Sequence, residues 1–270
     1  MKLTLSNAES NPATSGVLRS AQRLLTRKGR QHTKKFLVEG PQAVREALKI
    51  PGLVQRLLVV DISQHHALLA ETNIKNSAIE IFTITEKEFK KLSDTVSPQG
   101  ILAICQQLEA KLADIAAPKL VVICAQIRDP GNAGTVIRSA DAFGADAVLM
   151  TTGSVELHNP KTVRSSVGSI FHLPIITGIT TAEAATWCHD QGLQILAADA
   201  DGVLLTELSA TGELAKPTAW LMGNEAWGLP AEELGYADQV TAIPMWGKAE
   251  SLNLSTAATV CLYTSAVALK

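Results

Sequence analysis

The chain has 270 residues, of which 46% are hydrophobic and 19% charged, and its formal net charge is −2. This length allows two domains with their own cores, and no apolar run reaches the roughly 18 residues of a membrane span. The charge excludes a molecule that attracts polyanions over its whole surface. The polar start, 1–16, lacks a signal-peptide core, so we expect a flexible N-terminus and a cytoplasmic protein.

The first predicted element is a basic helix and turn, RSAQRLLTRKGRQHTKK, without a single acidic residue. Such a concentration of charge suits nucleic-acid phosphates, but it also fits a solvated helix face. The cations are Arg19, Arg23, Arg27, Lys28, Arg30, Lys34 and Lys35.

The next stretch alternates short strands and helices. A strand over 36–39 precedes a Gly-Pro break and a helix with apolar Val44, Ala47 and Leu48 at helical spacing. Further strands are predicted at VQRLLVVD, IEIFTIT and PQGILAICQQ. We therefore predict a small α/β domain over 17–108, followed by a linker over 109–119.

From Leu120 onward, strands and helices alternate regularly. Predicted strands are LVVICAQI, DAVLMT, LPIIT, LQILAAD, TAWLMG and VTAIPM; predicted helices are NAGTVIRSADAFG, NPKTVRSSVG, AEAATWCHDQG, AEELG and a C-terminal helix over 252–269. This order predicts a mainly parallel sheet with helices on both faces, spanning 120–270. Such sheets bind ligands beyond the carboxyl ends of their strands.

Polar residues follow three of these strands. Asn132 and Arg138 come after the first, Glu225 lies between two glycines after TAWLM, and Ser251 and Asn253 open the last helix. Because parallel strands end at one edge of a sheet, these side chains are expected to converge there.

Each residue also has a purely structural explanation. Asn132, Ser251 or Asn253 could cap a helix, Arg138 could form a surface ion pair, and Glu225 could stabilise the start of the following helix. Independent caps have no reason to gather at three strand ends, which favours a functional site.

Several familiar motifs are absent from the sequence. DPGNAG does not follow GxGxxG, and there is no GxxxxGK[ST], HExxH or GxSxG. The histidines lack metal-ligand spacing, so no metal site is predicted. The cysteines, Cys105, Cys124, Cys188 and Cys261, form no CxxC pair and are expected in the core.

Together, three stretches resemble the motifs of the TrmH/SpoU family of RNA ribose 2′-O-methyltransferases, in the SPOUT superfamily. They are DPGNAGTVIRSADAFGA, LMGNEAWGLP and IPMWGKAESLNLSTAATVCLY, with NPKTVRSSVGSIFHLPI similar to the stretch between the first two. Upstream, FLVEGPQAVREAL and SPQGILAI look like the small RNA-binding domain that precedes the catalytic domain in many members. The resemblance covers the chain from about residue 17.

The resemblance implies a Rossmann-like domain with a C-terminal trefoil knot, a homodimer, and S-adenosyl-L-methionine as cofactor. The family's cofactor-binding loops correspond to Met222, Gly223, Ile243, Met245 and Leu252. Its methyl group would face Asn132, Arg138, Ser251 and Asn253, whereas Glu225 is expected to matter without an assigned proton transfer. A guanidinium is a poor base, so we expect Arg138 to grip a phosphate and stabilise the developing alkoxide.

The implied partner is RNA, with ribosomal (23S) RNA favoured over transfer RNA. The basic segment then becomes the expected RNA contact, through Arg23, Arg27, Lys28, Arg30, Lys34 and Lys35. Trp227 and Trp246 could stack on bases or simply pack. The alternatives are a non-catalytic RNA-binding or ribosome-assembly protein and, with less support, a nucleotide-dependent oxidoreductase.

Overall fold

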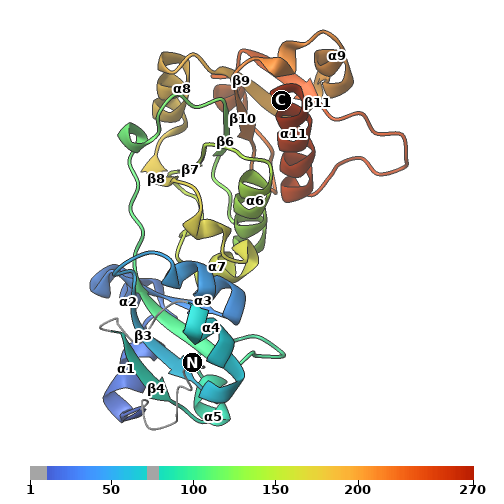
Figure 1. Ribbon diagram of the computed structural model, residues 1–270. Coiled ribbons are helices and arrows are strands. Elements are labelled where there is room, and N and C mark those ends of the chain that lie inside the picture. Colours follow the sequence, from blue (N-terminus) through green and yellow to red (C-terminus); the bar gives the residue numbers. More distant parts are fainter. Residues whose placement is uncertain (1–10, 72–78) are drawn as a thin grey trace. The chain divides into compact units, whose positions relative to one another are not determined.

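The computed structural model describes residues 11–71 and 79–270 (Figure 1). The chain forms two compact units. Unit 1 comprises Met1–Leu108 and His158–Phe171, and unit 2 comprises Glu109–Leu157 and His172–Lys270. Of the predicted flexible segment, residues 1–10 lie outside the described residues.

Unit 1 is built on a mixed sheet whose described strands follow the order β1-β4-β3-β5-β2. β5 runs antiparallel to β2 and β3, whereas β3 and β4 are parallel. The strands are β1 (Asn11–Pro12), β2 (Lys35–Glu39), β3 (Val54–Val59), β4 (Glu80–Thr83) and β5 (Ile101–Gln106). The helices are α1 (Ser15–Arg23), α2 (Arg27–Thr33), α3 (Pro41–Leu48), α4 (His66–Glu71), α5 (Glu86–Phe89) and α7 (Pro160–Ser166), with 3-10 helices at Ile62–His65 and Ser169–Phe171.

The core of unit 1 joins α1 to one face of this sheet. Ala21 and Leu24 pack with Leu58, Leu102 and Phe89, all nearly inaccessible to solvent. The flexible start predicted over 1–16 is wrong for its last residues: β1 pairs with β4, and α1 begins at Ser15.

The basic segment forms two helices instead of one. The Thr26 side chain accepts a hydrogen bond from the Gly29 backbone at 3.1 Å and caps α2. A Cβ atom on Gly29 would lie 1.8 Å from the Arg23 carbonyl oxygen. The tight turn between the helices therefore requires glycine at this position.

Residues 158–171 belong to unit 1, although the sequence placed them within the second domain, 120–270. His158 Nε2 accepts a hydrogen bond from the Leu108 backbone at 3.1 Å, and its ring lies 4.5 Å from that of Phe36. Periodicity marks this stretch as a helix but cannot show which sheet it packs against. The physical reason for the difference is its apolar and aromatic contact with β2.

Unit 2 contains a sheet of parallel strands in the order β11-β9-β10-β6-β7-β8. The strands are β6 (Leu120–Cys124), β7 (Ala147–Thr151), β8 (Ile175–Ile179), β9 (Gln194–Leu204), β10 (Thr218–Met222) and β11 (Gln239–Ala242). The helices are α6 (Pro130–Ala142), α8 (Thr181–Asp190), α9 (Leu205–Ala210), α10 (Ala231–Leu234) and α11 (Leu254–Ala268), with 3-10 helices at Leu112–Asp114 and Glu213–Ala215. This confirms the predicted parallel α/β architecture.

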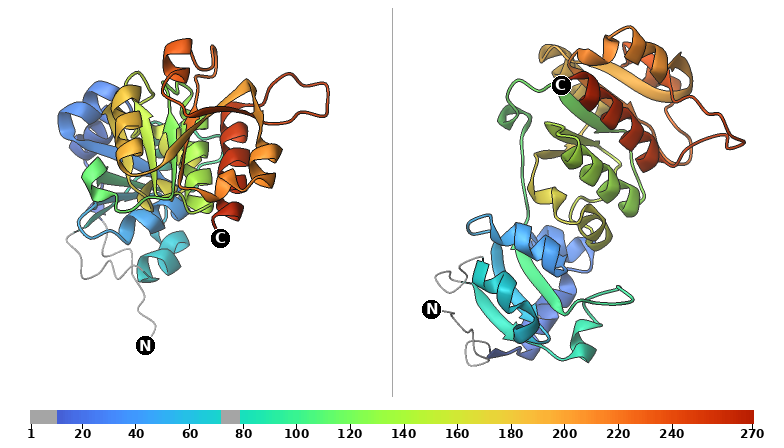
Figure 2. Two further views of the ribbon diagram at one scale, coloured as in Figure 1. Left: turned by 90° about the horizontal axis from the view of Figure 1, so that it is seen from above. Right: turned by 45° about the vertical axis from the view of Figure 1, so that its right-hand side comes forward.

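Both faces of this sheet are covered, which explains why β6, β7 and β10 are continuous apolar runs. α6 and α11 lie side by side on one face and α8 on the other (Figures 1 and 2). Val121 and Ile123 pack with α8, whereas Trp220 donates a hydrogen bond to Ser265 of α11 at 2.9 Å. The predicted linker 109–119 is part of unit 2, because Ile115 is buried in its core.

β9 makes an irregular pairing with β11. Val240 pairs with Ala197 and the next residue, Thr241, pairs with Val203, so residues 198–202 of β9 have no partner in β11. A Cβ atom on Gly202 would lie 2.5 Å from the Val240 carbonyl carbon.

Within the described ranges, no helix is long and apolar enough to cross a membrane.

Candidate active site at the ends of the parallel strands

The three polar loops converge through one carboxylate. Glu225, after β10, accepts hydrogen bonds from the backbone N–H groups of Arg128 at 3.1 Å and Asp129 at 3.0 Å, and from Asn132 Nδ2 at 3.2 Å. These donors lie at the entrance to α6, after β6. The predicted meeting of the first two motifs is therefore present.

Asn253 connects the third loop to the same group. Its Nδ2 donates to Asn132 Oδ1 at 3.0 Å, while its own Oδ1 accepts from the Ser255 and Thr256 backbones. Asn253 thus caps α11 and also binds Asn132. The sequence of bonds from Glu225 through Asn132 to Asn253, which we call the Glu–Asn–Asn chain, fixes the orientation of both amide groups.

The structure decides two of the alternatives that the sequence left open. The cap of α6 is Asp129, whose Oδ1 accepts from the Asn132 backbone at 2.8 Å, so Asn132 is not the cap. Glu225 does stabilise a helix start, but that of α6 and not of the helix that follows it in sequence.

A tight turn over 224–228 positions Glu225. Asn224 and Gly228 exchange backbone hydrogen bonds, and a Cβ atom on Gly223 would lie 2.5 Å from the Gly228 carbonyl carbon. Asn224 is 6% exposed, and its Nδ2 donates to the Gln126 carbonyl at 2.7 Å. The turn is thereby attached to the end of β6.

Gln126 is a positioning residue that our sequence analysis missed. Its φ of 53° lies in the left-handed region, which residues other than Gly and Asn rarely adopt. Its backbone N–H donates to Thr151 Oγ1, at the end of β7. No sequence pattern reveals this conformation, because glutamine carries no preference for it.

The carboxyl of Glu225 is ionised at neutral pH. Partial burial acts to raise its pKa, but hydrogen bonds from its own backbone, from Arg128 and from Asn132 outweigh burial and lower the pKa below 4.5. The ionised carboxylate strengthens each bond that it accepts.

Arg138 and Ser251 are exposed, and the structure does not bring either into a hydrogen bond or ion pair with a described residue. Arg138 lies on α6, next to Ser139, whose Oγ is 2.7 Å from Thr259 Oγ1 of α11. The surface ion pair considered for Arg138 is thus absent from the described part of the chain.

The predicted cofactor-binding residues lie in or beside the second and third of these loops. Met222 and Gly223 end β10, Ile243 and Met245 follow β11, and Leu252 precedes the cap of α11. Ile243 and Leu252 are half-buried, and Met245 is 39% exposed. The segment between β11 and α11 extends away from the sheet (Figure 1).

One of the predicted RNA contacts is wrong. Arg30 is only 2% exposed, and its Nη1 donates to the Leu24 carbonyl at 2.8 Å, because α2 folds its side chain beneath the turn after α1. Of the other predicted contacts, Lys35 is half-buried and the rest are exposed: Arg23, Arg27, Lys28 and Lys34.

Two tryptophans lie near the second and third motifs. Trp227 is 47% exposed, with the Arg128 guanidinium 4.8 Å from its ring centre, and Trp246 is 88% exposed.

The cysteines are buried as predicted, and burial raises the pKa of Cys124 to about 12.

Comparison with known proteins decides between the classes that fit this geometry. Residues 119–263 match the model of the SpoU rRNA methylase family, and residues 17–103 match an MRM3-like substrate binding domain. The chain belongs to the SpoU rRNA methylase family. This confirms the resemblance drawn from the three motifs.

Relatives of this SpoU family chain include enzymes and solved structures that it matches along nearly their whole length. It is 36% identical over 247 residues to the 23S rRNA (guanosine(2553)-2′-O)-methyltransferase RlmP of Bacillus subtilis, covering 90% of this chain and 92% of that protein. It is 28% identical to a 23S rRNA (uridine(2479)-2′-O)-methyltransferase of Streptomyces viridochromogenes, covering 88% of this chain and 84% of that protein.

Among solved structures, the chain resembles the SpoU methyltransferase AviRb of S. viridochromogenes in complex with AdoMet. The TM-score is 0.80 at 26% identity, with 94% of this chain and 98% of that chain covered.

Proposed function

We propose that this chain is an S-adenosyl-L-methionine-dependent methyltransferase that methylates a ribose 2′-OH in 23S ribosomal RNA. The observation that carries the proposal is the Glu–Asn–Asn chain, which holds the three family motifs at one edge of the parallel sheet. A non-catalytic RNA-binding protein would not need both the Glu–Asn–Asn chain and an exposed Arg138.

The residues around this edge fit the cofactor. The apolar side chains of Ile243, Met245 and Leu252 are half-buried or exposed, and suit the face of an adenine ring. Met222 and Gly223 are expected to add backbone groups. When bound, S-adenosyl-L-methionine supplies an electrophilic methyl group on a sulfonium.

The protein's part in the reaction is orientation and charge. The reacting hydroxyl must lie in line with the methyl group and lose its proton, which passes to the neighbouring phosphate or to water. Asn132 and Asn253 are fixed by the Glu–Asn–Asn chain and position the ribose. Arg138 is exposed, so its guanidinium is accessible to grip the neighbouring phosphate and to stabilise the developing alkoxide. Ser251 shapes the pocket or orients Arg138.

Glu225 acts through Asn132. Its lowered pKa and the three hydrogen bonds that it accepts suit a positioning residue and not a proton acceptor.

Unit 1 grips the RNA. Arg23, Arg27, Lys28 and Lys34 are exposed on one short stretch and attract phosphates, whereas Arg30 has a structural role. Charge reversal at Arg27 and Lys28 should therefore weaken RNA binding without changing cofactor binding.

We further propose a homodimer, a C-terminal trefoil knot and a cytoplasmic location. Tyr263 and Val267 of α11 are 56% and 59% exposed, and the ring centres of Tyr263 and Phe143 lie 5.4 Å apart. These side chains form an apolar patch on α11 and the end of α6 that suits contact with a second copy of the chain. The register shift between β9 and β11, which leaves residues 198–202 without a partner in β11, marks the irregular edge where we place the knot. The location follows from the proposed ribosomal RNA substrate.

The test of the proposed function is methyl incorporation from labelled S-adenosyl-L-methionine into unmodified 23S rRNA and, separately, into unmodified transfer RNA. We expect label in 23S rRNA, with guanosine and uridine both examined because the relatives named above differ in that nucleoside. Incorporation into transfer RNA alone would overturn the substrate class. Binding of 23S rRNA with no incorporation, despite measured cofactor binding, would favour the ribosome-assembly alternative.

A further inference from the structure

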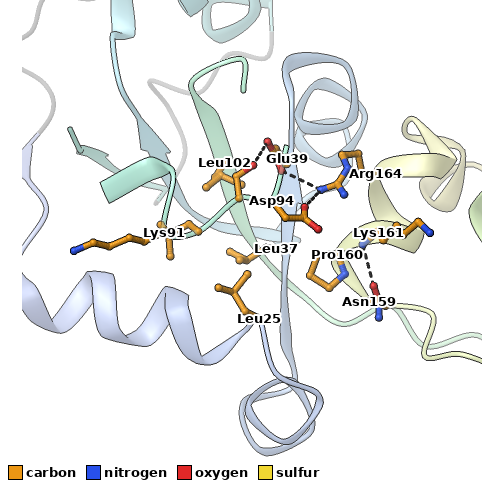
Figure 3. A pocket seen from close by; sticks show the side chains of 12 residues that line it. Leu25, Leu37, Glu39, Lys91, Asp94, Leu102, Asn159, Pro160, Lys161 and Arg164 are labelled. Atoms are coloured by element: carbon orange, nitrogen blue, oxygen red, sulfur yellow. Dashed lines mark hydrogen bonds and ion pairs between the residues drawn. The ribbon is translucent and has the colours of Figure 1, made fainter. Parts of the chain in front are cut away.

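Unit 1 contains a cavity of about 330 Å³ that the proposed function does not use (Figure 3). The volume falls at the lower end of the range for small-molecule sites, which suits a nucleoside. Four apolar side chains line part of the cavity: Leu25 in the turn after α1, Leu37 of β2, Leu102 of β5 and Pro160 of α7. These surfaces can contact the flat face of a base.

Another part of the lining is charged, and hydrogen bonds hold its side chains in place. Arg164 Nη1 donates to Asp94 Oδ1 and to Glu39 Oε2, at 3.4 Å in the second case, and Ser93 donates to Glu39 Oε1 at 2.6 Å. The side chain of Glu39 is 11% exposed, that of Arg164 29% and that of Asp94 73%. Asp94 is therefore the carboxylate that a ligand reaches most easily.

Both bonds from Arg164 use the same Nη1 atom, so the guanidinium has further N–H groups beside the Asp94 carboxylate. A hydrogen-bond donor and an acceptor thus stand side by side at the cavity wall, as Figure 3 shows. The Watson–Crick edge of guanine carries the complement, an acceptor oxygen next to two N–H donors. Uracil offers one N–H between two carbonyl oxygens, and these would face the carboxylate unfavourably.

The cavity also borders the basic segment. Leu25, one of its lining residues, is 39% exposed and lies between Arg23 and Arg27 in the turn joining α1 to α2. Lys91 and Lys161 add positive charge at the lining. A nucleotide in the cavity would therefore have cations available for the phosphates on either side of it.

We propose that this cavity binds an unstacked guanine nucleotide of the RNA substrate, other than the nucleotide that is methylated. The proposal rests on the proposed function, because it names how the same RNA is selected. Sequence-specific RNA recognition commonly uses unpaired bases that are splayed out and read on their edges. The apolar lining would hold the base, Asp94 and Arg164 would read its edge, and the lysines would hold the backbone.

The test uses the full chain and two labelled single-stranded RNA 11-mers, U5GU5 and U11, in fluorescence anisotropy titrations at one fixed salt concentration. We expect U5GU5 to bind about tenfold more tightly than U11, in line with one bidentate base contact. Leu25→Trp, which replaces a lining side chain with a much larger one, should abolish this difference, as should Asp94→Asn. Gln22→Trp is the matched control: it adds the same side chain at an exposed α1 position outside the lining, and should keep the difference.

Position is tested by replacing the guanine with 6-thioguanine and irradiating the complex. Crosslinks to the peptides that contain residues 91–94 or 159–164 are expected. Equal binding of the two RNAs by the wild-type chain, a preference that survives Leu25→Trp in a folded variant, or crosslinks confined to other peptides would each overturn the proposal.

These readouts need no methyl transfer. A chain that prefers U5GU5 but never methylates RNA would refute the proposed function alone, and a methylating chain without the preference would refute the cavity proposal alone.

Discussion

Replacing Glu225 distinguishes a positioning role from proton transfer. Glu225→Ala removes the acceptor of three hydrogen bonds of 3.0 to 3.2 Å. At about 1 kcal/mol each these amount to roughly 3 kcal/mol, and because Glu225 is exposed, water can replace part of the loss, leaving about 1–2 kcal/mol. For a unit of this size the expected fall in Tm is roughly 2–8 °C.

The effect on activity should be larger than the effect on stability. Without Glu225, the amide of Asn132 loses the partner of its Nδ2 and no longer presents a fixed Oδ1 to Asn253. A displacement of about 1 Å at a reacting group costs roughly 100-fold in rate. We therefore expect methyl transfer by Glu225→Ala to fall about 100-fold.

Glu225→Gln provides the decisive comparison. Its amide oxygen can occupy the place of Oε1 and keep the bonds from Asp129 and Asn132, while its NH2 group faces the Arg128 N–H and loses the third bond. The variant should retain activity within about tenfold of the wild type and lose less than half as much stability as Glu225→Ala.

The assays are thermal unfolding followed by fluorescence and single-turnover methyl transfer, with cofactor affinity measured in parallel. The lowered pKa of Glu225 means that its contribution to stability is present above its ordinary value of 4.5 and is lost as the pH falls through the lower folded value. Activity should therefore show no Glu225 titration between about pH 6 and 9. If Glu225→Gln were as inactive as Glu225→Ala with an unchanged Tm, the positioning account would be refuted in favour of proton transfer.

Four further predictions follow from individual contacts. Arg138→Ala should lower methyl transfer at least about 100-fold, while cofactor affinity stays within twofold in calorimetric titration. Arg138→Lys should weaken RNA binding as well as activity. If Arg138→Lys were inactive with intact RNA affinity, Arg138 would instead act as a base. Arg27→Glu with Lys28→Glu should weaken RNA binding in filter assays and flatten its salt dependence, whereas Arg30→Ala should lower Tm, because its guanidinium is buried. Burial, aided by the charge of Arg30, lowers the pKa of His158 from 6.5 to about 4. The contribution of His158 to stability is therefore complete above about pH 6.5 and is lost as the pH falls towards 4. Urea unfolding should show that the free energy of unfolding falls by about 3 kcal/mol over this range, and that His158→Gln removes the dependence on pH. Tyr263→Glu should convert the proposed dimer to a monomer in sedimentation experiments, and a wild-type monomer would contradict the proposed α6–α11 interface.

The sequence predicted the parallel sheet because both of its faces are covered. Continuous apolar strands such as 120–124, separated by helices of regular length, have few other solutions. The convergence of Asn132, Glu225 and Asn253 followed from the same rule, since parallel strands end at one edge. Backbone order alone therefore placed most of the Glu–Asn–Asn chain.

What the sequence could not predict depends on tertiary contacts. Arg30 carries the same charge as its neighbours, and only the turn at Thr26 explains why its side chain is buried. The helix over 160–166 has a clear pattern, but its attachment to unit 1 depends on His158 and Phe36, which are distant in sequence. Likewise, a glutamine gives no indication of the left-handed backbone at residue 126.

The cavity beside Leu25 illustrates the same limit. Its walls come from five separate stretches of the chain, and the ion pair between Arg164 and Asp94 joins residues 70 positions apart. A pattern in one stretch cannot reveal such a site.

Alkaline hydrolysis of RNA labelled by the wild-type protein shows whether the methyl group is on a ribose 2′-OH. A 2′-O-methyl group blocks cleavage at the next phosphodiester bond, so we expect the label in an alkali-resistant dinucleotide, and almost no label with Arg138→Ala. Label recovered in mononucleotides would mean that the methyl group is on a base, and would refute ribose methylation by this chain.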